Sequence, residues 1–368
     1  MIARRPRLVA VAGALLAAGL LAASCSGGGG DEDAAPEPTE PTTTTTAAPL
    51  PTYPLTGLPG ADADVLGDHP AVSVKMDNSP EARPQAGLNQ ADVVYELLVE
   101  GITRFAVIFH SEMPDPVGPV RSARSSDIDL VADLSTPLFA WSGGNLGVTD
   151  EVLRAARDGI LTNASYDVAT ASYYRSADRK APHNLYLHLP QLLESTTPDG
   201  QGAPAPLFLY READAAATGT PAAGVSVDFG LGVVVDYAWD AGRGGWARFQ
   251  VDARHPRPDS ATVDADGVQV SPANVVVLFT DYVPSPADAR SPMALSVGEG
   301  DAIVFTGGTV VTGRWSRPDA ARPAELVTAT GEPILLTPGR TWVEMPRTGS
   351  SVTVLDQPTA DGLLAVRR

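Results

Sequence analysis

The fold is decided by the stretch Ala71-Val72-Ser73-Val74-Lys75-Met76-Asp77-Asn78-Ser79-Pro80. Apolar residues at 72, 74 and 76 alternate with polar residues at 73 and 75, which predicts a β-strand. The residues from Asp77 to Pro80 are turn formers, and they end the strand in a polar loop.

Similar strands and helices alternate on the C-terminal side of this stretch. Residues 102–110 and 137–141 are expected strands, and residues 126–134 are an expected helix with one apolar face. Residues 91–99 fit a strand or a helix. A further helix begins near Asp150 with Thr149 as its cap, and Gly159 closes it. This alternation predicts an α/β domain over residues 53–195, with helices packed on a sheet.

The pattern becomes β-rich after a linker at residues 196–224, which is rich in Ala, Pro, Gly and Thr. Residues 233–239 and 246–251 flank a glycine-rich turn and predict a hairpin. More strands are expected at 275–279, 302–305, 309–315 and 341–345. The predicted class is therefore α+β: an N-terminal α/β domain, a smaller β-rich domain over 225–346 that forms a small sheet or barrel, and a tail over 347–368.

The first 24 residues indicate export. Three arginines precede an apolar run at residues 8–23, which is short for a membrane span because a spanning helix needs roughly 20 apolar residues. Small residues stand directly before Cys25, the one cysteine of the chain, so we expect cleavage there and lipidation of Cys25. The alternative is ordinary cleavage near Ala23, which would leave Cys25 as an unused thiol. Residues 25–52 read as a disordered Gly/Pro/Thr-rich, acidic tether.

Charge and anchoring together predict the location and exclude one class of partner. The net charge is −18, and it becomes −21 once the three arginines of residues 1–24 are removed. Such a chain is repelled by nucleic acid, so we expect none as a partner. The predicted location is the extracytoplasmic face of the cell membrane, with the lipid anchor as the membrane contact.

Three loops of the first domain are dense in polar residues and stand next to expected strands. They span residues 77–88, 118–127 and 175–184. Alternating α/β folds place ligand sites at such turns.

These loops resemble the YerB-like family of bacterial lipoproteins. The matching motifs include Arg83-Pro84-Gln85-Ala86-Gly87-Leu88, Gly118-Pro119-Val120-Arg121-Ser122-Ala123-Arg124 and Arg179-Lys180-Ala181-Pro182-His183-Asn184. In the C-terminal part, Gly313-Arg314-Trp315 and Pro338-Gly339-Arg340-Thr341-Trp342 are also similar. The resemblance extends from Tyr53 to Pro346. It implies two consecutive domains of unknown function and a surface location, and it implies no reaction.

The arginines of the loops point to an anionic ligand. Arg121 and Arg124 stand three residues apart just before the helix expected near Ser126, where backbone N–H groups and guanidinium groups can bind phosphate or carboxylate. The full predicted ligand-binding set is Arg83, Arg121, Arg124, Arg179, Lys180, His183 and Asn184. The expected polar partners are Asp77, Asn78, Glu96, Glu100, Arg104 and Asp127. Equally, the arginines can pair with these carboxylates and only hold the loops together.

No catalytic residue, cofactor or metal ion is assigned. His183 is the one histidine in a dense polar motif and is the best candidate base, although a structural histidine fits the same pattern. The sequence contains no His-x-x-x-His, no Gly-x-Ser-x-Gly and no phosphate-binding or dinucleotide fingerprint.

Three functions fit these residues. The first is a surface-tethered binding module that recognises an anionic envelope ligand or an envelope protein. The second is an envelope enzyme acting on a phosphate-containing, lipid-linked glycopolymer, since Val120 to Val131 is similar to the Arg-Ser-Asp segment of LytR-type transferases. The third is a purely structural lipoprotein. A cleft that brings Arg121, Arg124 and His183 together would favour the first two.

Overall fold

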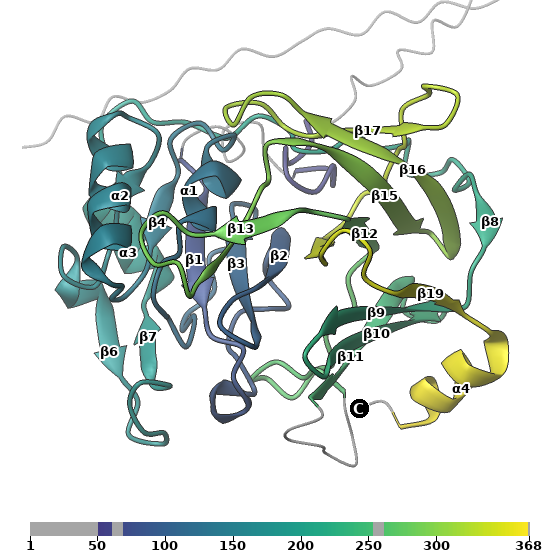
Figure 1. Ribbon diagram of the computed structural model, residues 1–368, viewed down its shortest axis with the longest axis horizontal. Helices are drawn as coiled ribbons and strands as arrows, with labels where there is room; N and C mark the ends of the chain where they lie inside the picture. The colour runs from purple at the N-terminus through teal and green to yellow at the C-terminus, as the bar shows by residue number, and fades with distance from the viewer. Residues whose placement is uncertain (1–50, 61–68, 253–260, 367–368) are drawn as a thin grey trace, which may run out of the picture. The chain divides into compact units, whose positions relative to one another are not determined.

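The strand predicted at residues 71–76 is present as β1 (Val72–Met76) inside a mixed sheet of eleven strands (Figure 1). The computed structural model describes residues 51–60, 69–252 and 261–366, so Cys25 and the predicted signal peptide lie outside the described residues. From one edge to the other the strands are β17 (Glu325–Thr328), β16 (Thr309–Arg317), β15 (Gly298–Thr306), β12 (Asn274–Leu278), β18 (Thr341–Met345), β2 (Val93–Leu98), β3 (Thr103–Phe109), β1, β4 (Leu138–Ala140) and β5 (Thr162–Asn163), with β8 (Thr220–Pro221) beside β16.

Most central strands of this sheet run in one direction. β3 pairs antiparallel with both β1 and β2, so β1 and β2 are parallel to each other. β4 is parallel to β1, and β18 is parallel to β2. The carboxyl ends of β1, β2 and β4 therefore meet at one edge, and this arrangement places their following loops together. The segment 91–99, which the sequence left open between strand and helix, contains strand β2.

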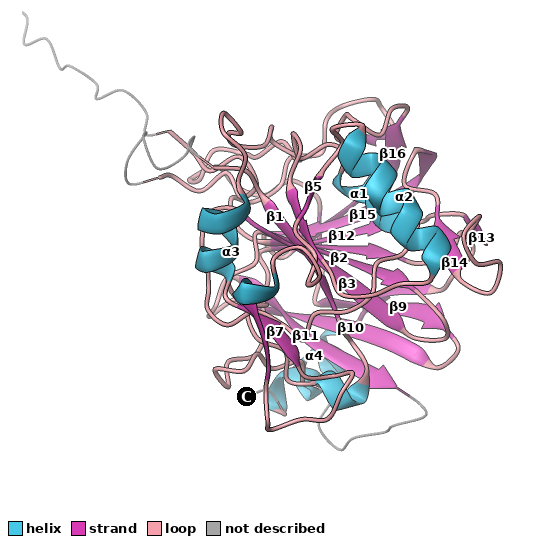
Figure 2. Cartoon of the chain, turned by 90° about the vertical axis from the view of Figure 1, so that its left-hand side faces the viewer, coloured by secondary structure: helices cyan, strands magenta, loops and turns pink. Residues whose placement is uncertain are grey.

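Helices α1 (Ser126–Val131) and α2 (Leu146–Arg157) cover one face of this sheet. Figure 2 shows the large sheet between these helices and the strands β9, β10 and β11. The expected cap of α2 is wrong: the helix begins at Leu146, and the Asn145 side chain accepts a 2.8 Å hydrogen bond from the Val148 N–H group. Thr149 lies inside the first turn, where it cannot cap. Gly159 follows the helix with φ +75°, as a closing glycine does.

The opposite face of the large sheet packs against a second sheet. Its order is β11 (Gly245–Asp252), β10 (Val233–Asp240), β9 (Gly224–Gly230) and β19 (Val352–Leu355). The predicted hairpin is β10 and β11. A small hairpin of β6 (Tyr173–Arg175) and β7 (Leu185–Leu187) and helix α3 (Leu189–Thr196) contribute to the same core. Two short 3-10 helices, at Pro80–Ala82 and Thr170–Ser172, lie in loops.

The β-rich part does not form a separate small sheet or barrel. The strands β9, β10, β11 and β19 make a sheet of their own and β13 pairs with β14, whereas β12 and β15 to β18 extend the sheet that β1 to β5 begin. The junction is the parallel pair β2 and β18, in which Val93 to Leu97 pair with Thr341 to Met345. Both parts thus belong to one compact unit from Pro49 onward. The α+β class is confirmed, and the predicted domain limits stay a prediction.

Two further elements follow or cross the sheets. The hairpin of β13 (Tyr282–Pro284) and β14 (Pro292–Ala294) reaches α1, where the Ala294 N–H group donates to the Ser126 hydroxyl at 2.9 Å. The segment predicted as a C-terminal tail contains β19 and helix α4 (Gln357–Ala365), which Asp356 caps by accepting from the Thr359 N–H group.

A buried ion pair joins the two sheets. Arg248 of β11 and Glu96 of β2 are both fully buried, and the Arg248 guanidinium donates to the Glu96 carboxylate. The same guanidinium lies 4.6 Å from the ring of Trp342 and donates to the Tyr237 hydroxyl at 3.2 Å. Tyr237 in turn donates to Glu344, which stands opposite Glu96 in the β2–β18 register. Burial and the neighbouring Glu96 carboxylate raise the pKa of Glu344 well above its ordinary value, which favours the protonated carboxyl group.

This network predicts opposite outcomes for two isosteric substitutions. Glu344→Gln should leave the free energy of unfolding unchanged or raise it at neutral pH, because an amide imitates the protonated carboxyl group and needs no proton uptake on folding. Glu96→Gln should lower it by about 3–5 kcal/mol, because Arg248 loses its buried carboxylate partner. Urea denaturation of both variants measures the difference. Equal losses would contradict the assigned charges.

The same pair predicts a pH dependence. Folded protein holds the Glu344 proton at pH values where the unfolded chain has released it, so wild-type stability falls as the pH rises above the ordinary pKa of glutamate. Glu344→Gln removes this loss. The stability difference between the two proteins should therefore grow as the pH rises above about 5, by at most about 1.4 kcal/mol per pH unit, until the pH reaches the folded-state pKa of Glu344. Parallel stability curves would show that Glu344 is ionised in the folded protein.

Candidate functional site

A cluster of charged side chains lies where β1 and β2 end. Asp77 follows β1 and is fully buried; its Oδ1 atom accepts from the Ser79 N–H group at 3.0 Å and from the Ser79 hydroxyl at 2.8 Å. Its Oδ2 atom lies 2.7 Å from His183 Nδ1 and 3.0 Å from Arg121 Nε. Burial raises the pKa of Asp77, but the bonds from Ser79 and His183 and the charge of Arg121 lower it further than burial raises it. Asp77 is therefore a carboxylate.

Ser79, His183 and Asp77 do not form a nucleophilic triad. The Ser79 hydroxyl lies 2.9 Å from His183 Nδ1, which is the same ring nitrogen that contacts Asp77. A relay needs one ring nitrogen for the nucleophile and the other for the carboxylate. His183 thus holds the loop 175–184 against Asp77 in this arrangement, and its side chain is 22% exposed at the rim of the cluster.

Arg124 is tied to Glu100 and to its own loop. Its Nε and Nη2 atoms donate to the two Glu100 oxygens at 2.8 and 2.7 Å, and its Nη1 atom donates to the Ala123 carbonyl at 2.9 Å. Burial raises the pKa of Glu100, but the hydrogen bonds from Arg124 and Ser291 bring it down to about 2. This is a bidentate arginine–carboxylate pair, the strongest geometry for such a contact.

Lys75 and Asp127 form a second pair beneath this one. Lys75 Nζ lies 2.6 Å from Asp127 Oδ1, and both side chains are fully buried. Asp127 Oδ2 also accepts from the Arg124 N–H group at 2.7 Å, which joins the start of α1 to β1. Desolvation lowers the pKa of Lys75 although Asp127 opposes this effect.

Arg104 of β3 is the cation of the cluster that lacks a carboxylate. Its side chain is 6% exposed, and among the described residues its Nε and Nη1 atoms have no hydrogen-bond partner. Burial, followed by repulsion from Arg124 and Arg121, lowers the pKa of Arg104 to about 10, although the charges of Asp77 and Glu100 oppose this shift. The guanidinium is therefore still charged at pH 7. A buried cation without a partner is costly, so such a group calls for an explanation.

The ion pairs of this cluster leave one positively charged side chain without a carboxylate partner. Within the described part of the chain, Lys75, Arg121 and Arg124 are matched by Asp127, Asp77 and Glu100, and Arg104 is not matched. Arg121 and Arg124 thus form the internal pairs that the sequence left open beside a bound anion, and their role in ligand binding stays a prediction. Arg104, which the sequence placed among the polar partners, is the unmatched cation.

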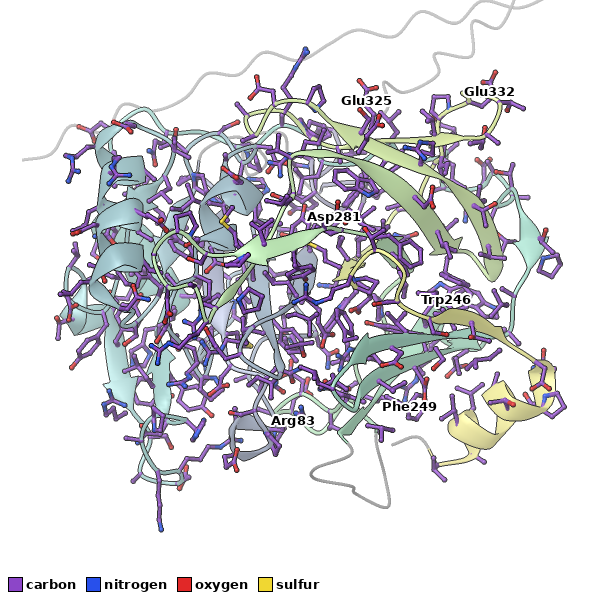
Figure 3. The ribbon with its side chains drawn as sticks, in the orientation of Figure 1. Arg83, Trp246, Phe249, Asp281, Glu325 and Glu332 are labelled. Carbon is purple, nitrogen blue, oxygen red and sulfur yellow. The ribbon has the colours of Figure 1, made fainter. Side chains whose placement is uncertain are left out.

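Other predicted ligand residues hold loops together. Arg83, labelled in Figure 3, donates to the Asn78 carbonyl at 2.7 Å and to the Asn78 side chain at 3.2 Å. Arg179 donates to the Ala82 and Pro84 carbonyls, and Asn184 donates to the Ser176 carbonyl at 3.0 Å. Lys180 is exposed on the same loop.

Glu96 belongs to the opposite face of the sheet. Alternation along β2 turns it toward Arg248, and Asn78 donates to it from the same side. Its prediction as a partner of the loop arginines is therefore wrong. The sequence also missed Ser291, which donates to Glu100, and Ser285, which lies 2.7 Å from the Ser125 hydroxyl. Both stand 160 or more residues along the chain from their partners, and no local pattern signals such a contact.

Three cavities of the described residues have linings that do not include Arg104, Arg121 or Arg124. A cavity of about 400 Å³ borders Glu100, Ser291 and Arg347, and two others lie beside β17, away from Arg104, Arg121 and Arg124. Within residues 51–60, 69–252 and 261–366, no three His, Cys, Asp or Glu side chains gather as a metal site would require. Within the same ranges, every helix is too short or too polar to cross a membrane.

Comparison with known proteins identifies close similarities. Residues 55–201 match the model described as "Protein of unknown function (DUF3048) N-terminal domain", and residues 225–343 match the corresponding C-terminal domain. The chain is 30% identical to the Bacillus subtilis protein named "Putative lipoprotein YerB" over 302 residues, which are 79% of this chain and 85% of that protein. It is also similar to the crystal structure of the YerB protein from Bacillus subtilis, with a TM-score of 0.67 and 25% identity over 82% of this chain and 99% of that one.

The unmatched charge can be tested by stability alone. Arg104→Met should leave the free energy of unfolding unchanged or raise it by about 1 kcal/mol, because it removes a buried charge that has no partner. Lys75→Met is the matched control on the same sheet face, and it should lower stability by about 3–5 kcal/mol, because it strands Asp127. Guanidinium denaturation without added anions compares the two. A loss of several kcal/mol in Arg104→Met would mean that Arg104 is neutralised inside the fold.

Proposed function

The chain belongs to the DUF3048 family, which includes YerB and has no assigned activity, and on that premise we propose that it is a lipid-anchored envelope protein that binds an anion at Arg104. The observation that carries this proposal is the buried guanidinium without a carboxylate. An anion at this place would supply the missing negative charge.

The surroundings of Arg104 suit such a ligand. Arg121 is 19% exposed and Arg124 15% exposed, so both guanidinium groups border the surface and flank the buried one. Their carboxylate partners hold them in fixed positions, and fixed donors bind with little loss of side-chain freedom. The cluster stands at the carboxyl edge of parallel strands, where α/β sheets commonly bind ligands.

Phosphate is the anion that fits this chemistry best. Guanidinium groups donate several parallel hydrogen bonds to phosphate oxygens, and the charge of Arg104 attracts the phosphate. We expect a small ligand, because the protein as a whole is strongly acidic and would repel a long polyanion. We therefore infer a small phosphate-bearing component of the cell envelope.

The location rests on a different set of residues. A relative that covers most of the chain carries the word lipoprotein in its name, and this chain has a cysteine directly after an apolar export segment. We infer that Cys25 carries the lipid and that the folded part works outside the cytoplasm, close to the membrane.

Anion binding should be visible as thermal stabilisation. Pyrophosphate at about 100 times its Kd should add about 2.7 kcal/mol to the stability of the wild-type protein, since it binds the folded state alone. Arg104→Met should weaken pyrophosphate binding at least about tenfold, because a charge-assisted hydrogen bond is lost. Thermal melts over a pyrophosphate titration measure both effects.

The control for this titration is Arg314→Met. Arg314 lies on β16 far along the sheet order from β3, is half exposed, and pairs with Asp301 and Glu299. This variant should bind pyrophosphate as the wild type does. Equal affinity of Arg104→Met and wild type, or no stabilisation of the wild type by phosphate or pyrophosphate, would overturn the proposed anion site.

Anchoring is tested separately from binding. Cys25→Ala should move the protein from the membrane fraction to the medium or a soluble fraction, because the acyl chains are its membrane attachment. Ser26→Ala, one residue further on, should stay with the membrane. Membrane fractionation with immunoblotting distinguishes the variants, and membrane retention of Cys25→Ala would rule out lipidation at that residue.

A further inference from the structure

A second candidate site lies at the edge of the large sheet, far from the arginine cluster in the strand order. An outer groove of about 580 Å³ runs between residues 206–209 and strand β17. Apolar and proline side chains line most of it, among them Leu207, Phe208, Leu326 and Ile334. Glu325, labelled at the top of Figure 3, belongs to its rim. Leu209 in the same groove is 59% exposed, so the apolar lining continues onto the surface.

The groove adjoins a small inner cavity. This cavity of about 30 Å³ shares the lining residues Leu207, Phe208, Ala324 and Leu326 with the groove. Its remaining lining includes two charged groups, which are Asp133 from the turn after α1 and Arg317 from β16. An apolar entrance therefore leads to a polar end.

The polar end contains an unused hydrogen-bond acceptor. Asp133 is 5% exposed, and its Oδ2 atom lies 3.1 Å from Arg317. Its Oδ1 atom is buried and has no partner among the described residues. Arg317 is fully engaged, since it also donates to the carbonyls of Asp129, Ala320 and Arg322. Asp133 Oδ1 therefore lacks a hydrogen-bond donor. An anionic ligand would not suit this cavity, because the Arg317 guanidinium already donates to other groups.

We propose that the groove binds an uncharged amphiphile whose apolar body lies against Leu207, Phe208 and Leu326 and whose terminal hydroxyl or amide group donates to Asp133 Oδ1. A pocket of this size, with an apolar lining and few polar groups, is the usual form of a small-molecule site. The head group is neutral because Arg317 already balances the Asp133 charge. A cationic head would put a second positive charge beside Arg317, and an anionic head would face the carboxylate.

Burial supports this assignment from the side of the protein. It raises the pKa of Asp133 to about 7, although Arg317 opposes the shift. The carboxylate is thus poorly solvated, and a donor from a ligand would replace the hydration that it lacks. This site is independent of the proposed anion site, because no residue of the arginine cluster lines either cavity.

Two probes of equal size test the head group. Octanol and heptyl methyl ether have the same number of heavy atoms, and only octanol can donate a hydrogen bond. Calorimetric titration of the mature chain carrying Cys25→Ala should show saturable binding of octanol and about tenfold weaker binding of the ether, which is the effect of one hydrogen bond to a charged group. Equal affinities would overturn the role of Asp133.

Two variants test the location. Ala324→Phe places a large side chain at a position that lines both cavities and should abolish octanol binding, whereas Ala321→Phe, in the same loop but outside the lining, should bind octanol as the unsubstituted chain does. Both substitutions lie at partly exposed positions, so the fold should tolerate them. Absence of saturable octanol binding, or octanol binding that Ala324→Phe leaves unchanged, would overturn the proposal.

The groove could instead be covered by a second copy of the chain. Sedimentation velocity at increasing protein concentration decides this point. The proposal expects a sedimentation coefficient that Ala324→Phe does not change. Self-association that this substitution abolishes would assign the groove to a second copy and overturn the amphiphile. Pyrophosphate titration of Ala324→Phe should match the wild type, so a failure here stays distinct from a failure of the anion site.

Discussion

The ion pair between Arg248 and Glu96 is the constraint on which the rest of the structure depends. Its two charges come from different sheets and from positions 152 residues apart, and neither is exposed to water. Separating the sheets would leave both ions in an apolar core, where an unpaired charge is very costly. The stack of the guanidinium on Trp342 and its bond to Tyr237 hold it in one orientation. The two sequence segments are therefore parts of one folded unit.

The two faces of the large sheet differ in how their buried charges are paired. On the face toward β9 to β11, Arg248 and Glu96 balance each other in the core, and the raised pKa of Glu344 favours its uncharged form. On the face toward α1, Lys75 and Asp127 balance each other, but Arg104 is left without an acid. Because the buried ions on the first face are paired, the unpaired Arg104 on the second face is informative. This contrast is the reason for assigning a ligand to Arg104 rather than to the more conspicuous Arg121 and Arg124.

Local patterns predicted the elements better than their partners. Alternation along residues 71–76 and 102–110 identified β1 and β3, and the glycine-rich turn identified the hairpin of β10 and β11. The separate β-rich sheet was wrong because β12 and β18 join β2 through a parallel register. Parallel pairing joins segments that are far apart in the chain, and neither segment carries a local signal for its partner. The predicted cap of α2 was wrong for a local reason. Asn145 and Thr149 both have side chains that can cap a helix, and the structure uses Asn145.

The sequence by itself determined the periodicity of the strands and helices, the apolar segment before Cys25 and the gathering of polar residues in loops 77–88, 118–127 and 175–184, because each depends on neighbours in the chain. The tertiary structure alone decided which charges are matched. Glu100 meets Arg124 and Ser291 across 24 and 191 residues, Glu96 turns to the other face, and Asp133 meets Arg317 in a buried corner. The physical reason is that the cost of a charge depends on its burial and on the distance to its counter-ion, and both are properties of the folded chain in three dimensions.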